Sequence, residues 1–130
     1  MFDDSKGPIE HFSWGTYVIQ GQQHAKTNAG KVGVGKDIRL IGREVTAWRE
    51  RKGHQLTPAM ITGVFDCDIE VLIIGIGVYG AVGVPEDVLQ AIREKGINRL
   101  ILERTPEACH TYNALFHEGR RVALLAHGTC

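Results

Sequence analysis

The chain has 130 residues, of which 43% are hydrophobic and 23% charged, and its 15 Lys and Arg residues balance 15 Asp and Glu. This length and composition are typical of one globular domain that buries its own core. The zero formal charge predicts no general attraction to nucleic acid or to a membrane surface, and no apolar run approaches the ~20 residues of a membrane-spanning helix.

The first residues and the cysteines bear on location. Residues 1–8 are expected to be a frayed lead-in, and they lack the pattern of a secretion signal or a mitochondrial presequence. Cys67, Cys109 and Cys130 are odd in number, far apart and never in a C-x-x-C pair. This usage favours a reducing compartment. The sequence therefore predicts a cytoplasmic protein.

Residues 9–53 have a β pattern. Short runs of aromatic and β-branched residues on either side of Gly15 predict two strands, and residues 37–41 and 44–48 predict two more, joined by a turn. Residues 20–28 are polar and indicate no element, and the glycines of residues 30–36 indicate a loop. This N-terminal β portion is expected to extend or flank the sheet formed by the rest of the chain.

Residues 70–105 predict a strand, a glycine-rich turn, a helix and a second strand. The apolar run at 71–74 is typical of a central strand covered on both faces. Three glycines follow in the spacing G-x-G-x-x-G, and Pro85 then opens a helix that ends at Gly96. Residues 98–103 are the next buried strand.

Two Thr-Pro pairs predict helix starts. The pair at 57–58 opens a short helix, and the pair at 105–106 opens one that runs to about residue 118. A last apolar strand follows at 121–126. The C-terminal half is thus a β-α-β-α-β unit with parallel strands, and residues 1–130 form a single α/β domain around a mixed β-sheet.

Several segments together resemble one family. They are I-I-G-I-G-V-Y-G at 73–80, P-E-D at 85–87, T-P-E-A-C-H-T-Y-N-A-L at 105–115, G-R-R-V-A at 119–123 and D-I-R-L-I-G-R-E-V-T-A-W at 37–48. Most of the chain from residue 9 onward resembles the small Mth-type domain of unknown function, whose animal relatives include an adipogenesis-associated protein and a mitochondrial complex I assembly factor. The resemblance implies a three-layer α/β fold and no established reaction.

The glycine turn is the main candidate for a ligand site. Dinucleotide binding is disfavoured because five residues separate Gly80 from the helix signals, and because a three-strand half forms only one side of such a site. An anion site at the carboxyl ends of the strands is the broader hypothesis. The alternative is a purely structural turn, with the threonine before Pro106 capping its own helix. The candidate ligand-binding residues are Gly75, Gly77, Tyr79, Gly80, Arg104 and Thr105.

The remaining candidates are weaker. Cys109 lies at a helix start, where a helix dipole lowers a thiol pKa, although a buried packing role is more common for such a cysteine. His127 and Cys130 have H-x-x-C spacing without a second ligand pair in the sequence, so we predict no metal and no cofactor. Trp48, beside a basic run, is a candidate partner-binding residue. No nucleophile–base–orienter set is visible, so we assign no catalytic residue.

Two hypotheses for function follow. The favoured one is a non-catalytic binding or assembly module that contacts an unidentified protein partner and forms homo-oligomers. The alternative is a small enzyme or ligand-binding protein that takes an anionic metabolite or nucleotide into the crevice at the glycine turn. We favour the first because a fold alone licenses no reaction. Neither nucleic acid nor a membrane is an expected partner.

Overall fold

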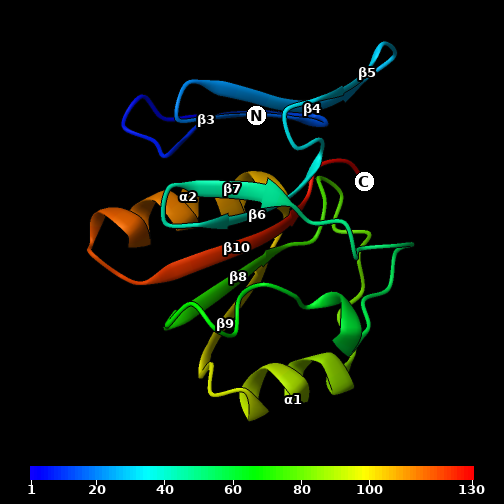
Figure 1. Cartoon of the computed structure of the whole chain (residues 1–130), viewed down its shortest axis with the longest axis vertical. Coiled ribbons are helices and arrows are strands. Elements are labelled where there is room, and N and C mark those ends of the chain that lie inside the picture. Colours follow the sequence, from blue (N-terminus) through cyan, green and yellow to red (C-terminus); the bar gives the residue numbers. More distant parts are fainter.

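Two β-sheets with a helix between them form this structure, a computed structural model that describes residues 1–130 (Figure 1). The first sheet is an antiparallel meander in chain order. Its strands are β1 (Phe2–Asp3), β2 (Ile9–Ser13), β3 (Thr16–Ile19), β4 (Gln22–Thr27) and β5 (Gly30–Val32).

The second sheet is mixed and has the order β7-β6-β10-β8-β9. The strands β10, β8 and β9 are parallel to one another, as expected, and β6 runs antiparallel to β10. The strand β9, predicted to be buried, lies at the edge of the sheet and is partly exposed. Only β6 and β7 of the N-terminal β portion join this sheet, while β1 to β5 make a sheet of their own. The strands are β6 (Asp37–Ile41), β7 (Glu44–Ala47), β8 (Val71–Gly75), β9 (Arg99–Glu103) and β10 (Val122–His127).

The two helices cover opposite faces of the mixed sheet. Helix α2 (Thr105–His117) packs between the two sheets, and α1 (Glu86–Glu94) lies on the outer face with the short 3-10 helix η1 (Pro58–Met60) (Figure 1). Sheet, helix and sheet form three layers, with α1 covering the outer face of the mixed sheet, and the expected α/β fold is confirmed. Neither helix is long and apolar enough to cross a membrane.

The apolar strand β8 shows why the mixed sheet lies at the centre. Val71 and Ile73 point into the core shared with α2, while Leu72 and Ile74 point into the core under α1. Successive side chains of a strand point to opposite faces, so a continuous apolar run fits a strand that is covered on both sides. All five residues of β8 are buried, which confirms the predicted central strand.

The N-terminal residues, expected to be frayed, are held against α2. Phe2 and Asp3 form β1, and the buried side chain of Asn113 donates to Asp4 Oδ2 at 3.0 Å. The same amide pairs with the backbone N–H and carbonyl of Ile9. Hydrogen bonds from the backbone of Lys6 and from Asn113 lower the pKa of Asp4. Asn113 thus joins the first sheet to the helix, because a buried amide needs partners for its donors and its acceptor.

Candidate functional site

The glycine turn after β8 is filled by the protein's own backbone. Gly77 has φ +99°, and a Cβ atom there would overlap the backbone of Cys130. The Gly77 N–H donates to Thr105 Oγ1 at 3.0 Å, and the Thr105 hydroxyl donates to the carbonyl of His127 at 2.7 Å. Gly75 lies against Thr105 and Ala126. The glycines therefore permit a close approach of the C-terminal segment.

Residues 128–130, the C-terminal segment, are bound by two turns. The N–H groups of Val78 and Ala81 donate to the carbonyls of Thr129 and Cys130 at 2.6 and 3.0 Å. From the other side, the Gly15 N–H in the β2–β3 turn donates to the Gly128 carbonyl at 2.7 Å. The C-terminal segment is thus a structural part of the region that was predicted to be a crevice.

The predicted ligand-binding residues divide into two groups. Gly75, Gly77 and the fully buried Thr105 lie together around the C-terminal segment. Arg104, not Thr105, is the residue that precedes the first turn of α2, and it makes no side-chain cap. The exposed side chain of Arg104 lies against Gly80. The threonine hydroxyl therefore fixes the glycine turn and does not cap the helix.

The exposed aromatic surface differs from the predicted one. Trp48, the candidate for partner binding, is 1% exposed, and its indole N–H donates to the Met60 carbonyl at 2.8 Å. Its ring lies in the core beneath α1 and is not available to a partner. Tyr79 is 69% exposed and contacts Trp14, which is 47% exposed, with ring centroids 5.4 Å apart. This aromatic pair joins the glycine turn to the β2–β3 turn.

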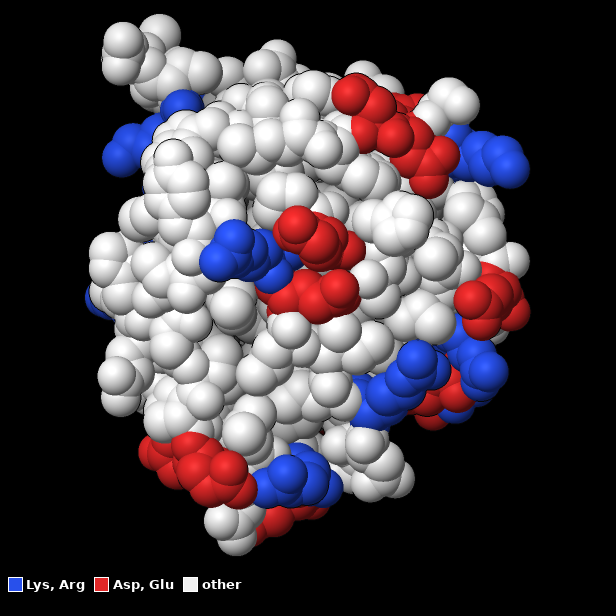
Figure 2. Space-filling model, turned by 180° about the vertical axis from the view of Figure 1, so that it is seen from behind, with Lys and Arg blue, Asp and Glu red and all other residues white.

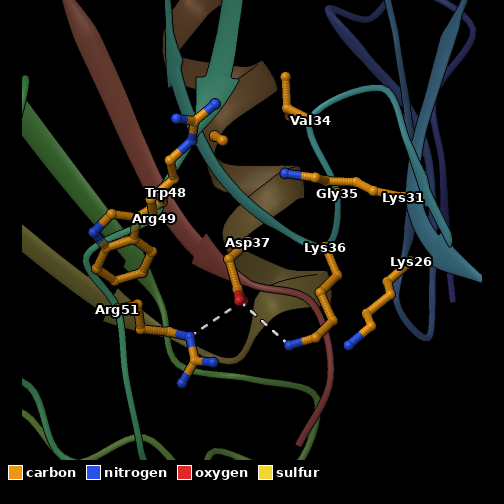
Figure 3. A pocket seen from close by; sticks show the side chains of 10 residues that line it. Lys26, Lys31, Val34, Gly35, Lys36, Asp37, Trp48, Arg49 and Arg51 are labelled. Atoms are coloured by element: carbon orange, nitrogen blue, oxygen red, sulfur yellow. Dashed lines mark hydrogen bonds and ion pairs between the residues drawn. The ribbon is translucent and has the colours of Figure 1, made fainter.

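A basic cavity of about 370 Å³ is lined by the strands β4 and β5 and by the residues around β6 and β7 (Figure 3). β4 and β5 contribute Lys26 and Lys31, and the residues around β6 and β7 contribute the others. The cationic side chains belong to Lys26, Lys31, Lys36, Arg49 and Arg51, and the one acidic side chain belongs to Asp37. One third of the chain's 15 Lys and Arg residues thus line one cavity.

Asp37 neutralises only part of this charge. Its carboxylate lies 3.3 Å from both Arg51 Nε and Lys36 Nζ (Figure 3) and 2.7 Å from His127 Nδ1. Burial alone would raise the pKa of Asp37, but the hydrogen bond from His127 and the two cations outweigh it and lower that pKa. Lys26, Lys31 and Arg49 make no ion pair. The cavity therefore has a surplus of positive charge and suits an anion.

The sequence patterns did not predict this cavity, because residues 20–36 indicated only a polar stretch and a glycine-containing loop. The lysines lie at intervals of five residues in that stretch, and a second basic run occupies 49–52. Neither run is unusual by itself, and only strand pairing brings them together. The face of the molecule seen in Figure 2 has cationic and acidic side chains mixed in small groups, and the chain as a whole has no formal net charge. The local surplus is thus a feature of the cavity and not of the whole surface.

The cysteine and histidine candidates lie in different environments. Burial raises the pKa of the Cys109 thiol well above its ordinary value, and the side chain packs in the core. His127 and Cys130 lie beside His54, and the ligand atoms of the three residues are within 4.8 Å of one another. His54 is 76 residues from Cys130 in the chain, so the sequence offered no signal that would add it to the H-x-x-C pair.

These features define a single α/β domain in which a helix separates an antiparallel sheet from a mixed one. Residues 9–127 match the family described as "Protein of unknown function (DUF498/DUF598)", and the chain belongs to this family. The match confirms the resemblance to the Mth-type domain of unknown function.

A curated relative carries the name of an assembly factor. The chain is 32% identical over 83 residues to "NADH dehydrogenase [ubiquinone] 1 alpha subcomplex assembly factor 3" of Rattus norvegicus. The aligned part is 62% of this chain and 44% of the relative, so the match spans less than half the length of that protein.

Two solved structures share the fold over nearly the whole chain. The conserved hypothetical protein PH1505 from Pyrococcus horikoshii OT3 is 21% identical, with a TM-score of 0.74 and coverage of 94% of this chain and 98% of the other. A protein of Bartonella henselae described as an outer membrane protein is 27% identical, also with a TM-score of 0.74, and 95% of each chain is covered. These likenesses support the α/β fold.

Proposed function

We propose that this chain is a non-catalytic protein-binding module that takes part in the assembly of a partner complex. The observation that carries the proposal is the exposed aromatic pair, Trp14 and Tyr79, which contact each other across two turns. Trp and Tyr are enriched among the residues that contribute most to protein–protein binding, since they bury a large area at a small entropic cost. The name of the assembly-factor relative supports the same function.

The turns that carry this pair are held in place before any partner binds. The Tyr79 turn and the Trp14 turn are both hydrogen-bonded to the C-terminal segment, through Val78 and Gly15 respectively. A surface that is already ordered loses less conformational entropy on binding. A partner protein would therefore find two aromatic rings in a fixed arrangement, which favours a specific contact.

The test is partner capture with a matched surface variant. The double variant Trp14→Ser/Tyr79→Ser removes the pair, and Leu102→Ser removes an exposed apolar side chain that lines a separate cavity with Leu89 and Arg93. We expect a protein to co-purify in a fixed ratio with the wild type and with Leu102→Ser. With the purified partner, the double variant should bind at least about 10-fold more weakly. Equal binding by all three proteins, each with native thermal unfolding, would overturn the proposal.

The basic cavity supports a second function, the binding of a small anion. Its volume of about 370 Å³ is in the range of small-molecule sites, and its cations exceed its acids by four. Native mass spectrometry of the protein as purified tests this function and the predicted homo-oligomer together. A retained anion that is lost from the variant Lys26→Gln/Lys31→Gln would support the cavity. Failure to retain or bind added phosphate or pyrophosphate would exclude it for these anions.

Location in the cytoplasm stays a prediction. Fluorescence microscopy of the tagged full-length protein in its own cells tests it, and a signal confined to a membrane or an organelle would contradict it.

A further inference from the structure

His54, His127 and Cys130 converge at the edge of the C-terminal segment. Cys130 Sγ lies 3.2 Å from His54 Nε2 and 4.0 Å from His127 Nε2. In a tetrahedral zinc site with Zn–S near 2.3 Å and Zn–N near 2.05 Å, the sulfur and nitrogen ligands are about 3.6 Å apart. The two observed separations lie about 0.4 Å on either side of this value. We propose that these three residues form a binding site for one Zn²⁺ ion.

The second coordination sphere fits the same assignment. Asp37 is paired with Arg51 and Lys36 at 3.3 Å, so its carboxylate accepts hydrogen bonds and His127 Nδ1 donates to Asp37 Oδ1 across 2.7 Å. In the neutral imidazole this leaves a lone pair on Nε2, which lies 4.0 Å from Cys130 Sγ. A carboxylate behind a metal-binding histidine fixes the ring and its tautomer in many zinc sites. The hydroxyl of Thr129, 3.1 Å from the same Nε2, must rotate away when a metal binds.

The backbone places the ligands before the metal arrives. His127 ends β10, and the carbonyl of Cys130 accepts a hydrogen bond from the Ala81 N–H at 3.0 Å. The His54 carbonyl accepts from the Gly83 N–H at 2.7 Å, and Leu56 donates back to Gly83. Residues 81–83 thus bind both the His54 loop and the C-terminal segment. The three ligands come from two distant parts of the chain and are already held together by the backbone. This lowers the entropy that is lost when the ion binds.

The three ligands differ in exposure, so one side of the site faces the protein interior and the other faces solvent. His127 is 2% exposed, Cys130 is partly buried and His54 is exposed. The ion would enter from the side of His54, and a fourth position stays open for water.

Asp37 and His127 also form part of a cysteine–histidine–aspartate row that resembles a nucleophilic triad. The imidazole of His54 is closer to the Cys130 sulfur than that of His127 is. It has no role in such a triad, so its position favours a metal site.

The test is Zn²⁺ binding by the full chain with its purification tag removed. We expect one Zn²⁺ per chain with a Kd of about 1 µM or lower, measured by titration against a chromophoric chelator. His54→Gln and Cys130→Ser should each weaken binding at least about 10-fold. His11→Gln and Cys67→Ser, which alter a partly exposed histidine and an exposed cysteine elsewhere, are the matched controls and should bind as the wild type does.

Two further measurements distinguish a thiolate–imidazole site from adventitious binding. Co²⁺ should give the near-ultraviolet charge-transfer absorption of a cobalt–thiolate bond, and Cys130→Ser should lose it. Zn²⁺ should slow the alkylation of Cys130 by iodoacetamide and leave Cys67 in the same sample unaffected. The positioning variant Asp37→Asn should keep the cobalt–thiolate band and bind Zn²⁺ about 10-fold more weakly.

The proposal is overturned if the wild type binds no Zn²⁺ at concentrations up to about 100 times the expected Kd. It is also overturned if Cys130→Ser or His54→Gln binds as the wild type does. Fast alkylation of Cys130 that Zn²⁺ does not affect, and that falls in His127→Gln, would favour the nucleophilic triad instead. Far-ultraviolet circular dichroism of each variant shows whether the fold is kept, and His54→Gln alters an exposed side chain.

Discussion

The glycine turn at residues 75–80 and the basic cavity border the same end of β10, and they differ in what fills them. At the turn, Gly77 lies against the backbone of Cys130, so the chain occupies the space that its glycines leave. At the cavity, cationic side chains from separate segments surround an open volume of about 370 Å³. A glycine pattern thus indicates that another group lies close to the backbone. That group can be another part of the same chain and need not be a ligand.

The largest expected effect is at the turn. Gly77→Ala combines a positive φ of +99° with an overlap on the Cys130 backbone, and it should lower the free energy of unfolding by about 3 kcal/mol or more. Gly42→Ala is the matched control, because Gly42 also has a positive φ, +58°, but has nothing within 4 Å of the added Cβ. It should cost about 1 kcal/mol. Urea unfolding measures both, and equal losses would mean that Gly77 has no special contact.

A smaller effect is expected from the hydroxyl that holds the turn. Thr105→Val keeps the shape of the side chain and removes the acceptor for Gly77 N–H and the donor for the His127 carbonyl. Two buried groups lose their partner, so we expect a loss of about 2 kcal/mol in the free energy of unfolding. Thr111→Val, on the partly exposed side of α2, should change it by less than about 0.5 kcal/mol. A similar change for both variants would contradict the role of Thr105.

At the cavity we expect a change in binding with no change in stability. Lys26→Gln/Lys31→Gln removes two cations without ion-pair partners and should weaken pyrophosphate binding about 10-fold. Lys52→Gln, an exposed lysine outside the cavity, is the control and should bind normally. Isothermal titration calorimetry measures the affinity and thermal unfolding measures the stability. A loss of stability in the double variant would show that the cavity, like the turn, is a structural element.

The smallest expected effect is on the pH dependence of stability. The pKa of Asp37 is lowered in the folded protein, so its stabilising contribution is present above its ordinary pKa and is lost as the pH falls through the folded value. Urea unfolding between pH 7 and pH 3 should therefore show a steeper loss for the wild type than for Asp37→Asn. Parallel curves would mean that the ion pairs at Asp37 contribute nothing to the folded state.

Sequence patterns predicted the elements whose signals are local. The apolar run of β8, the strand at Asp37–Ile41 and the proline-marked start of α2 all have the predicted type and place. The Thr57-Pro58 signal produced only the single 3-10 turn Pro58–Met60, because no apolar helical pattern follows it. β4 and β5 were missed since their residues are mostly polar and exposed, and they become strands through hydrogen bonds to β3 and to each other.

By itself, the sequence determined the α/β class, the family and the parallel strands, because apolar periodicity and helix-start residues act over a few neighbouring positions. Tertiary structure alone decided the candidate functional surfaces. It buried Trp48, paired Trp14 with Tyr79, gathered the lysines of residues 26–36 with Arg49 and Arg51, and brought His54 to Cys130. Those contacts join residues far apart in the chain, and their partners are chosen by strand pairing and core packing, which no local pattern encodes.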